Sequence, residues 1–171
     1  MLKDEIFQSA DLCVVGNINR DIRLAPIEPG NHLFEDGETT VAWTTETVGG
    51  GATNSACAAA ALGARVGLIA KTGVDCVAQR LEQTLIRHGV RPHLVKSEAC
   101  STGTSVAVSF TTGHRHFISS LPNNESLTLG DLPLAALDGY THLFRADVWF
   151  STRMLQGGNE RLFQYARARG M

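Results

Sequence analysis

The sequence has no surplus of positive charge, because 15 Lys and Arg stand against 17 Asp and Glu in 171 residues, a formal net charge of −2. Without such a surplus, a protein gains little from releasing the counterions of nucleic acid or of an anionic membrane surface. Long hydrophobic runs are also absent: the longest, the alanine-rich segment 56–62, is far shorter than the roughly 20 residues that cross a bilayer. We therefore expect a small-molecule ligand, and neither nucleic acid nor a membrane as a partner.

Cysteines are few and scattered. Cys13, Cys57, Cys76 and Cys100 form no CxxC pair, and most of them lie in apolar or helical segments, where a thiol packs as a small hydrophobic group. Residues 1–11 lack the order of basic, apolar and small residues that marks a secretory signal. These absences favour a reducing, cytoplasmic location and argue against a disulfide or a zinc site.

What the sequence does contain is an alternation of short apolar strands and helices. The predicted strands cover 12–16, 65–70 and 141–146, and the predicted helices cover 53–62, 76–88, 132–137 and 159–169. Asp75 is a suitable N-cap for the helix over 76–88. This alternation indicates an α/β fold with a doubly wound sheet, and we expect a single domain over residues 1–171.

Two further segments do not fit this alternation. Residues 39–48 (TTVAWTTETV) have the β-branched composition of a strand, and residues 104–119 resemble a β-hairpin with Gly113 in its turn. Together they predict a second, small sheet. The hairpin carries His114 and His116 on one strand face, and this spacing could hold a metal with a third ligand. Because no other ligand lies close by in sequence, we expect exposed histidines and no metal site.

The most informative segment is 48–62, VGGGATNSACAAAAL. Three glycines before a helix of small residues let a ligand reach the backbone, and the free N–H groups at the helix start suit a hydroxyl or phosphate oxygen. The alternative reading is a glycine turn and an alanine helix that merely pack closely. The segment lacks the last glycine of a GxGxxG pattern, and residues 67–72 (GLIAKT) lack the Walker A spacing, so neither a dinucleotide site nor a P-loop is indicated.

Extended to VGGGATNSACAAAALGARVGLIAKTGVD, the same segment resembles the first signature of the PfkB family of carbohydrate kinases, which are ribokinase-like. That signature is a GG-x-x-x-N helix followed by LGA, a strand and a TG-x-D turn. The opening VVGNINRD resembles the family's first strand with its sugar-contacting N-x-D, and Ser101–Gly103 resembles an S-T-G that precedes a lid hairpin. The resemblance extends in order over nearly the whole chain.

The resemblance implies a ribokinase-like doubly wound sheet, incomplete here, with a small β-sheet lid whose strands lie at about 39–48 and 104–119. Such a lid excludes water from the sugar and often makes dimer contacts, which implies a homo-oligomer formed through the lid strands. The substrate-binding residues implied by the resemblance are Asn19, Asp21, Gly50, Gly51, Asn54 and Asp147. For Asp147 a solvated loop carboxylate is the alternative. Ribokinases proper have GGKGAN where this chain has Gly51 and Thr53, so ribose itself is not indicated as the substrate.

The family's second signature, of the type D-T-x-G-A-G-D, supplies an anion hole and a catalytic base, and these 171 residues contain no such segment. The sequence therefore predicts the sugar-binding, amino-terminal part of an ATP- and Mg²⁺-dependent sugar kinase, inactive alone and without catalytic residues of its own. The alternative is a non-catalytic sugar- or nucleoside-binding module that acts with a partner chain. A nucleotide-dependent oxidoreductase is a weaker third hypothesis.

Overall fold

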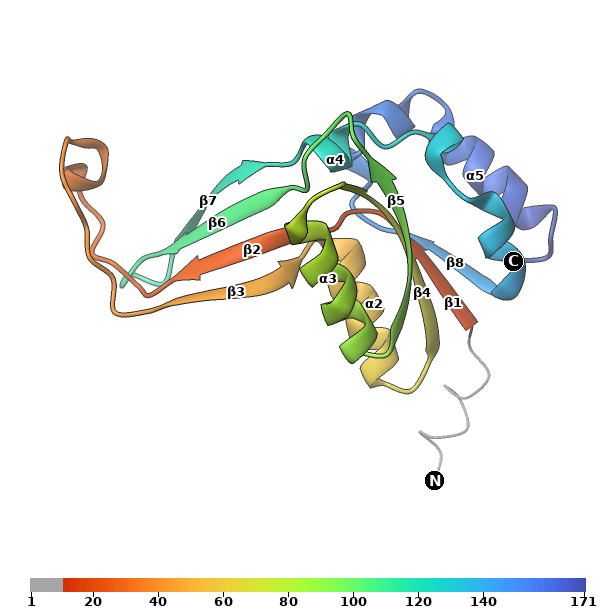
Figure 1. Ribbon diagram of the computed structural model, residues 1–171, viewed down its shortest axis with the longest axis horizontal. Coiled ribbons are helices and arrows are strands. Elements are labelled where there is room, and N and C mark those ends of the chain that lie inside the picture. Colours follow the sequence, from red (N-terminus) through yellow and green to blue (C-terminus); the bar gives the residue numbers. More distant parts are fainter. Residues whose placement is uncertain (1–10) are drawn as a thin grey trace.

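The computed structural model describes residues 11–171, so residues 1–10, on which the expectation of no secretory signal rests, lie outside the described part. The described chain forms two four-stranded sheets (Figure 1). One sheet is packed between helices and makes the body of the molecule. The other projects from the body as a long arm.

The body sheet has the strand order β5-β4-β1-β8, and all of its strands are parallel. The strands are β1 (Asp11–Val15), β4 (Arg65–Gly73), β5 (Val90–Ser97) and β8 (His142–Arg145). Parallel neighbours need crossover connections, and helices supply them here. The α/β class predicted from the sequence is therefore confirmed.

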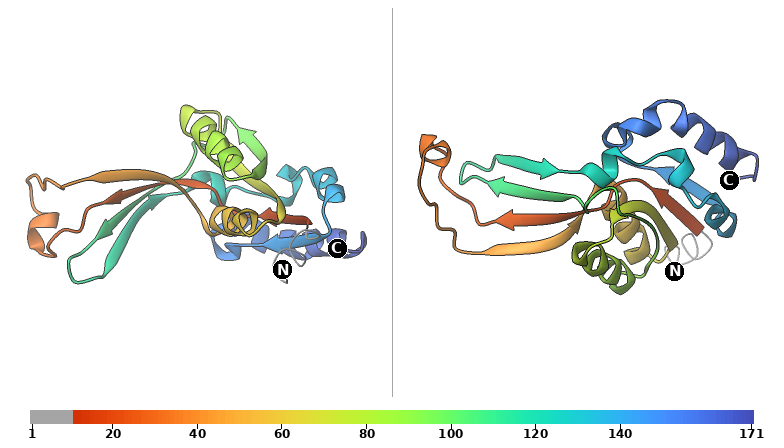
Figure 2. Two further views of the ribbon diagram at one scale, coloured as in Figure 1. Left: turned by 90° about the horizontal axis from the view of Figure 1, so that it is seen from below. Right: turned by 45° about the horizontal axis from the view of Figure 1, so that its top comes forward.

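Helices cover both faces of the body sheet, on opposite sides of it (Figure 2). One face packs against α2 (Gly51–Ala61) and α3 (Cys76–Arg87). The other packs against α5 (Gly158–Arg167) and a series of short helical turns. These turns are η2 (Leu129–Asp131), η3 (Leu134–Gly139) and η5 (Thr152–Leu155). Two further short turns, α4 (Pro122–Glu125) and η4 (Val148–Phe150), follow β7 and β8 in the chain.

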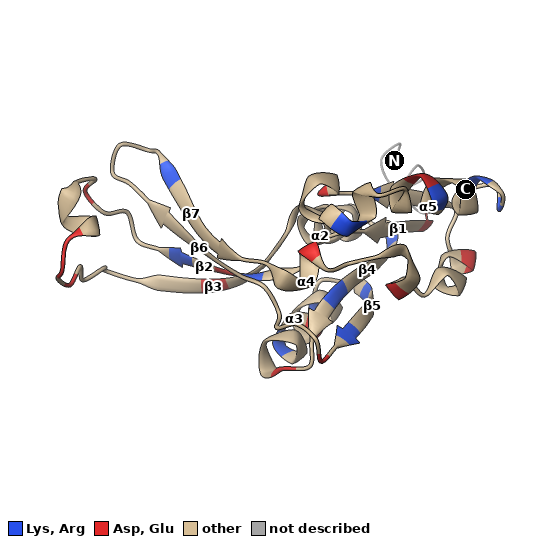
Figure 3. Ribbon diagram, turned by 90° about the horizontal axis from the view of Figure 1, so that it is seen from above, with Lys and Arg blue, Asp and Glu red and all other residues tan. Residues whose placement is uncertain are grey.

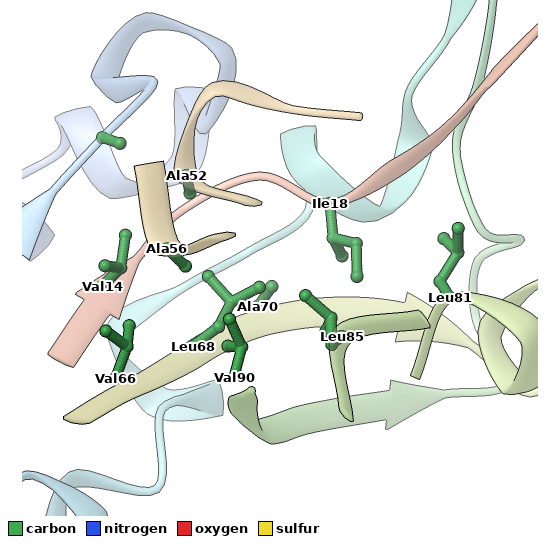
Figure 4. Close-up of a cluster of buried hydrophobic side chains, with 11 residues drawn as sticks. Val14, Ile18, Ala52, Ala56, Val66, Leu68, Ala70, Leu81, Leu85 and Val90 are labelled. Carbon is green, nitrogen blue, oxygen red and sulfur yellow. The ribbon is translucent and has the colours of Figure 1, made fainter. Parts of the chain in front are cut away.

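The strand residues alternate between two hydrophobic cores, as the twofold period of a strand requires. Val14 points into the core beneath α2 and α3, where Leu68 and Leu85 are fully buried (Figure 4). Cys13 and Val15 point to the opposite face. Burial of each large apolar side chain contributes about 1.5–3 kcal/mol, so both faces are needed to hold the sheet.

Among residues 11–171, none of the helices has both the length and the apolar composition that a membrane span requires.

The arm is a mixed sheet with the order β3-β2-β6-β7. Its strands are β2 (Asn19–Leu24), β3 (Thr44–Gly49), β6 (Thr104–Ser109) and β7 (Arg115–Ser120). β2 is parallel to β6, and the other two pairings are antiparallel. The hairpin expected over 104–119 is present, and Gly113 in its turn has φ 84°.

The strand expected over 39–48 begins only at Thr44, so its first half was wrongly predicted. Its partner β2 ends at Leu24, which pairs with Thr44, and the residues before Thr44 therefore have no neighbouring strand. The loop before them contains a short turn, η1 (Asn31–Phe34), at the far end of the arm in Figure 1. The helix expected over 132–137 is a 3-10 helix, η3, and it lies two residues later.

Two strands were not predicted from the sequence. β2 is a polar strand, NRDIRL, and lacks the apolar run by which the body strands were predicted. β5 contains Pro92, which argues against a central strand. The body sheet tolerates this proline because β5 is an edge strand that pairs with β4 alone.

Asn123 fastens the arm to the body. Its amide nitrogen donates to the backbone oxygens of Ile18 (2.9 Å) and Lys71 (2.7 Å), and its side-chain oxygen accepts from the backbone N–H of Gly103 (2.8 Å). Ile18 precedes β2 and Gly103 precedes β6, so one fully buried side chain joins both entrances to the arm to the end of β4. Buried amides with their partners satisfied fix local geometry firmly.

Candidate functional site

A cavity of about 310 Å³ lies where the arm meets the carboxyl ends of β1 and β8. Ligands of open α/β sheets bind at this end of the strands. The cavity is lined by Asn17, Asn19, Asp21, Gly50, Gly51, Ser105, Phe117, Ser119, Leu121, Asp147 and Phe150. Five of the six residues predicted as substrate contacts are therefore brought together, from three separate regions of the sequence.

Asn19 and Asp21 project from the start of β2 at positions i and i+2, which places them on one face of the strand. The side-chain nitrogen of Asn19 donates a hydrogen bond to Oδ1 of Asp21. A Cβ atom on Gly49, at the end of β3, would lie 2.2 Å from the carboxyl carbon of Asp21, so only glycine fits at this position. Burial raises the pKa of Asp21, and Arg23 and the Asn19 hydrogen bond offset this only in part.

Gly50 lets the chain turn from β3 into α2 directly beneath this pair. Its φ of 98° is unfavourable for other residues, and a Cβ atom there would lie 2.5 Å from the backbone oxygen of Asn17. The same oxygen accepts a hydrogen bond from Thr53 Oγ1 at 3.1 Å. The glycine run thus brings the start of α2 against the loop between β1 and β2.

Asp147 reaches the site from the end of β8 and binds the start of α2. Its Oδ2 accepts a hydrogen bond from the backbone N–H of Ala52 at 2.8 Å. Asp147 has φ 54° and is the single non-glycine residue with positive φ in the described range 11–171. Such a conformation outside glycine is uncommon and concentrates at functional sites. The helix start that was expected to face a ligand freely is therefore partly occupied by this carboxylate.

Arg145 holds the backbone turn that presents Asp147. Its side chain is buried, donates to the backbone oxygen of Val15 (3.1 Å) and to that of Ala146, and donates through Nε to Asn159 Oδ1 (3.0 Å). Burial lowers the pKa of Arg145, and the nearby charge of Asp147 opposes that shift. The guanidinium thus supports the site from beneath without lining the cavity.

Asn54 is the predicted contact that does not join the others. Its side chain is exposed and lines a different cavity of about 420 Å³, between α2, α3 and β3, together with Glu46 and Arg80. In a helix that starts at Gly51, Asn54 lies on the side turned toward α3, while the backbone of Gly51 faces Asp147. Asn54 and Asp21, both predicted as substrate contacts, therefore line two different cavities in this structure.

Several lining residues were missed by sequence reasoning. Ser105 and Ser119 face each other across β6 and β7, with their hydroxyl oxygens 2.7 Å apart, and Phe117 follows the same twofold period as Ser119. The predicted hairpin could have identified these three. No sequence pattern pointed to Asn17 or Phe150 as lining residues. In the structure, Oδ1 of Asn17 accepts a hydrogen bond from Ser151 Oγ at 3.2 Å.

The cavity can bind hydroxyl groups but does not suit a nucleoside triphosphate. Two carboxylates and the amides of Asn17 and Asn19 offer acceptors and donors to a polyol. None of the lining residues is Lys or Arg, and the N–H of Ala52, which a phosphate could use, already donates to Asp147. No group of three His, Cys, Asp or Glu side chains able to hold a metal occurs within residues 11–171, and His114 and His116 are exposed on the arm.

A family model described as pfkB family carbohydrate kinase matches residues 9–170. Among solved structures, ribokinase from Giardia lamblia is similar with a TM-score of 0.79 and 17% identity, covering 95% of this chain and 52% of that one. Adenosine kinase from Sinorhizobium meliloti gives 0.75 and 19%, covering 94% and 54%. Fructokinase with bound ATP from Xylella fastidiosa gives 0.73 and 17%, covering 94% and 49%.

The TM-scores establish a shared fold, and no curated protein matches the chain significantly. The chain spans about half the length of the solved structures that it matches. Both the parallel body sheet and the projecting mixed sheet belong to the part that is shared.

Proposed function

The chain belongs to the pfkB family of carbohydrate kinases, and from that premise we propose that it supplies the sugar-binding part of an enzyme that transfers phosphate from ATP to a sugar or related hydroxyl compound. The observation that carries the proposal is the convergence of Asn19 and Asp21, Gly50 and Gly51, and Asp147 on one cavity.

Within the cavity, each group has a task that suits a polyol. Asp21 accepts hydrogen bonds from sugar hydroxyls through the oxygen that Asn19 leaves free, and Asp147 does so through the oxygen that does not bind Ala52. The glycine backbone lets the sugar ring approach closely. The arm acts as the lid: Ser105 and Ser119 lie over the cavity, and closure would exclude water from the reacting hydroxyl.

ATP, with magnesium, is the phosphate donor that the family implies, but the cavity has no Lys or Arg among its lining residues to hold the phosphates. Transfer of phosphate is mostly positioning and charge stabilisation, and the second family signature that would supply both is absent from the 171 residues. We therefore propose that these residues bind sugar and do not catalyse transfer alone. Radiolabelled phosphate appearing on a sugar in the presence of this chain alone would contradict that statement.

Binding of sugars by the wild-type chain and by Asp21→Asn tests the proposed site directly. By isothermal titration calorimetry, with D-fructose and D-ribose as probes, the variant should bind at least about tenfold more weakly, since one charge-assisted hydrogen bond is lost. Asp36→Asn is the matched control, because Asp36 is exposed in the arm loop and lies away from the cavity. Equal sugar affinities for the two variants would show that Asp21 does not contact the sugar.

A further inference from the structure

The charge of the cavity restricts what can bind in it. Its lining contains the carboxylates of Asp21 and Asp147, and none of its residues is Lys, Arg or His. Arg145 is near Asp147, but it is only 6% exposed and donates to backbone oxygens beneath the site. A phosphate or carboxylate on the substrate would therefore face two carboxylates, and none of the residues that line the cavity supplies a cation to pair it, which is unfavourable in a partly buried site.

The same cavity has two aromatic walls from different parts of the molecule. Phe117 comes from β7 on the arm and Phe150 from η4 on the body, three residues after Asp147. The two residues are 47% and 55% exposed, so neither ring is fully covered by the protein itself. Leu121 adds a third apolar surface. A bare sugar ring, whose surface is rich in hydroxyls, would not make full use of these walls.

We propose that the substrate of this site is an uncharged polyol that carries a planar or apolar group, as a nucleoside does, and that sugar phosphates are excluded. The inference rests on the proposed function. Hydroxyls bind on the side of Asp21 and Asp147, and the planar group packs against Phe117 and Phe150. Aromatic side chains stack well on planar groups, and closure of the arm brings Phe117 onto the ligand.

The strands of the arm carry three arginines, Arg20, Arg23 and Arg115, and none of them lines the cavity. Acidic and basic residues both occur along the arm in Figure 3. Arg115 on β7 lies over the ring of Phe117, with its guanidinium carbon 5.5 Å from the ring centre. If a phosphorylated sugar used this side chain, its binding would depend on Arg115, and Arg115→Ala reveals that dependence.

Three matched ligands test the proposal on the 171-residue chain: ribose, adenosine and ribose 5-phosphate share the polyol and differ by a planar base or a phosphate. In calorimetric titrations we expect adenosine to bind at least about tenfold tighter than ribose, and ribose 5-phosphate at least about tenfold weaker than ribose. Phe150→Ala should bring the ratio of adenosine to ribose affinity close to one. Phe117→Ala should lower that ratio as well.

Phe163→Ala is the matched control, because Phe163 is 44% exposed on α5 and lies outside the cavity, so the affinity ratio should not change. Binding of ribose 5-phosphate as tight as that of ribose, with or without dependence on Arg115, would overturn the proposal. So would a ratio that Phe150→Ala leaves intact. If all three ligands bind without dependence on Asp21, or none binds, the proposed function itself fails, and with it this inference.

Discussion

The carboxylate of Asp21 is held in the cavity at a cost to the fold. Burial raises its pKa above the ordinary value of 3.8, so the folded chain holds this proton more tightly than the unfolded chain. The resulting stabilisation is present below the ordinary pKa and is lost as the pH rises through the raised value. At neutral pH the ionised group therefore opposes folding while it serves the site.

Replacement of Asp21 by asparagine should separate stability from binding. We expect Asp21→Asn to be at least as stable as the wild type at pH 7, with an advantage that shrinks as the pH falls toward about 4. Urea denaturation at several pH values measures the difference in the free energy of unfolding between the two proteins. Groups that titrate equally in both proteins cancel in this difference. An advantage that grows on acidification would show that the charged form of Asp21 is stabilised instead.

Gly50 and Gly63 offer a matched pair of substitutions. They have φ values of 98° and 95°, but a Cβ atom at Gly50 would meet the Asn17 backbone oxygen at 2.5 Å, whereas one at Gly63 meets nothing within 4 Å. Gly63→Ala should cost about 1 kcal/mol for the unfavourable φ alone. Gly50→Ala should cost about 3 kcal/mol, because the backbone at the site must also move. Equal free energies of unfolding for the two variants would contradict a steric role for Gly50.

At the level of elements, one carboxylate couples helix α3 to the arm. Asp75 caps α3 by accepting from the backbone N–H of Ala78 at 2.8 Å, and its other oxygen accepts from the N–H of Thr102 at 2.8 Å, just before β6. Burial acts to raise the pKa of Asp75, but these hydrogen bonds outweigh it and the pKa is lowered. Its contribution to stability is therefore present above the ordinary pKa and is lost as the pH falls.

Loss of this carboxylate should loosen both elements. Asp75→Ala is expected to reduce the free energy of unfolding by about 2 kcal/mol, since an N-cap and a second backbone donor lose their acceptor. Asp75→Asn keeps one acceptor oxygen and should cost less. Amide hydrogen exchange should show faster exchange at both Ala78 and Thr102 in the alanine variant. Faster exchange at Ala78 alone would mean that the arm is held by other contacts.

At the level of the whole molecule, both sheets end in strands with a free edge. β8 pairs with β1, and no strand within residues 11–171 pairs with its other edge; Phe144 in β8 and Trp149 in η4, the turn that follows it, are 45% and 80% exposed. On the arm, every residue of the edge strand β7 is exposed. Exposed strand edges and apolar side chains favour association with another chain.

We therefore expect the chain to self-associate in solution, with the arm as the proposed dimer surface. Size-exclusion chromatography with light scattering should give a mass above that of one 18.4 kDa chain. Ile118→Ser on β7 and Phe144→Ser on β8 distinguish the two surfaces, since only the variant at the contact that forms should shift the mass toward a monomer. A monodisperse monomer for the wild type would refute the expectation.

The sequence by itself determined the local features. The continuous apolar run of Cys13, Val14 and Val15 predicted a buried strand, Asp75 predicted the start of α3, and the glycine run predicted the turn into α2. These local features follow from the order of apolar and polar residues and from backbone sterics within a few residues, and both can be seen in a short segment of sequence. The family resemblance added the grouping of Asn19, Asp21 and Asp147, which no local pattern contains.

Only the tertiary structure decided the rest. Asp147 meets the start of α2 across 95 residues of sequence, Ser105 meets Ser119 through strand register, and Asn54 turns toward α3 and away from the cavity. Each outcome depends on how far one element is rotated or shifted against another. Packing of the two cores sets those rotations, and a pattern read along the chain does not contain them.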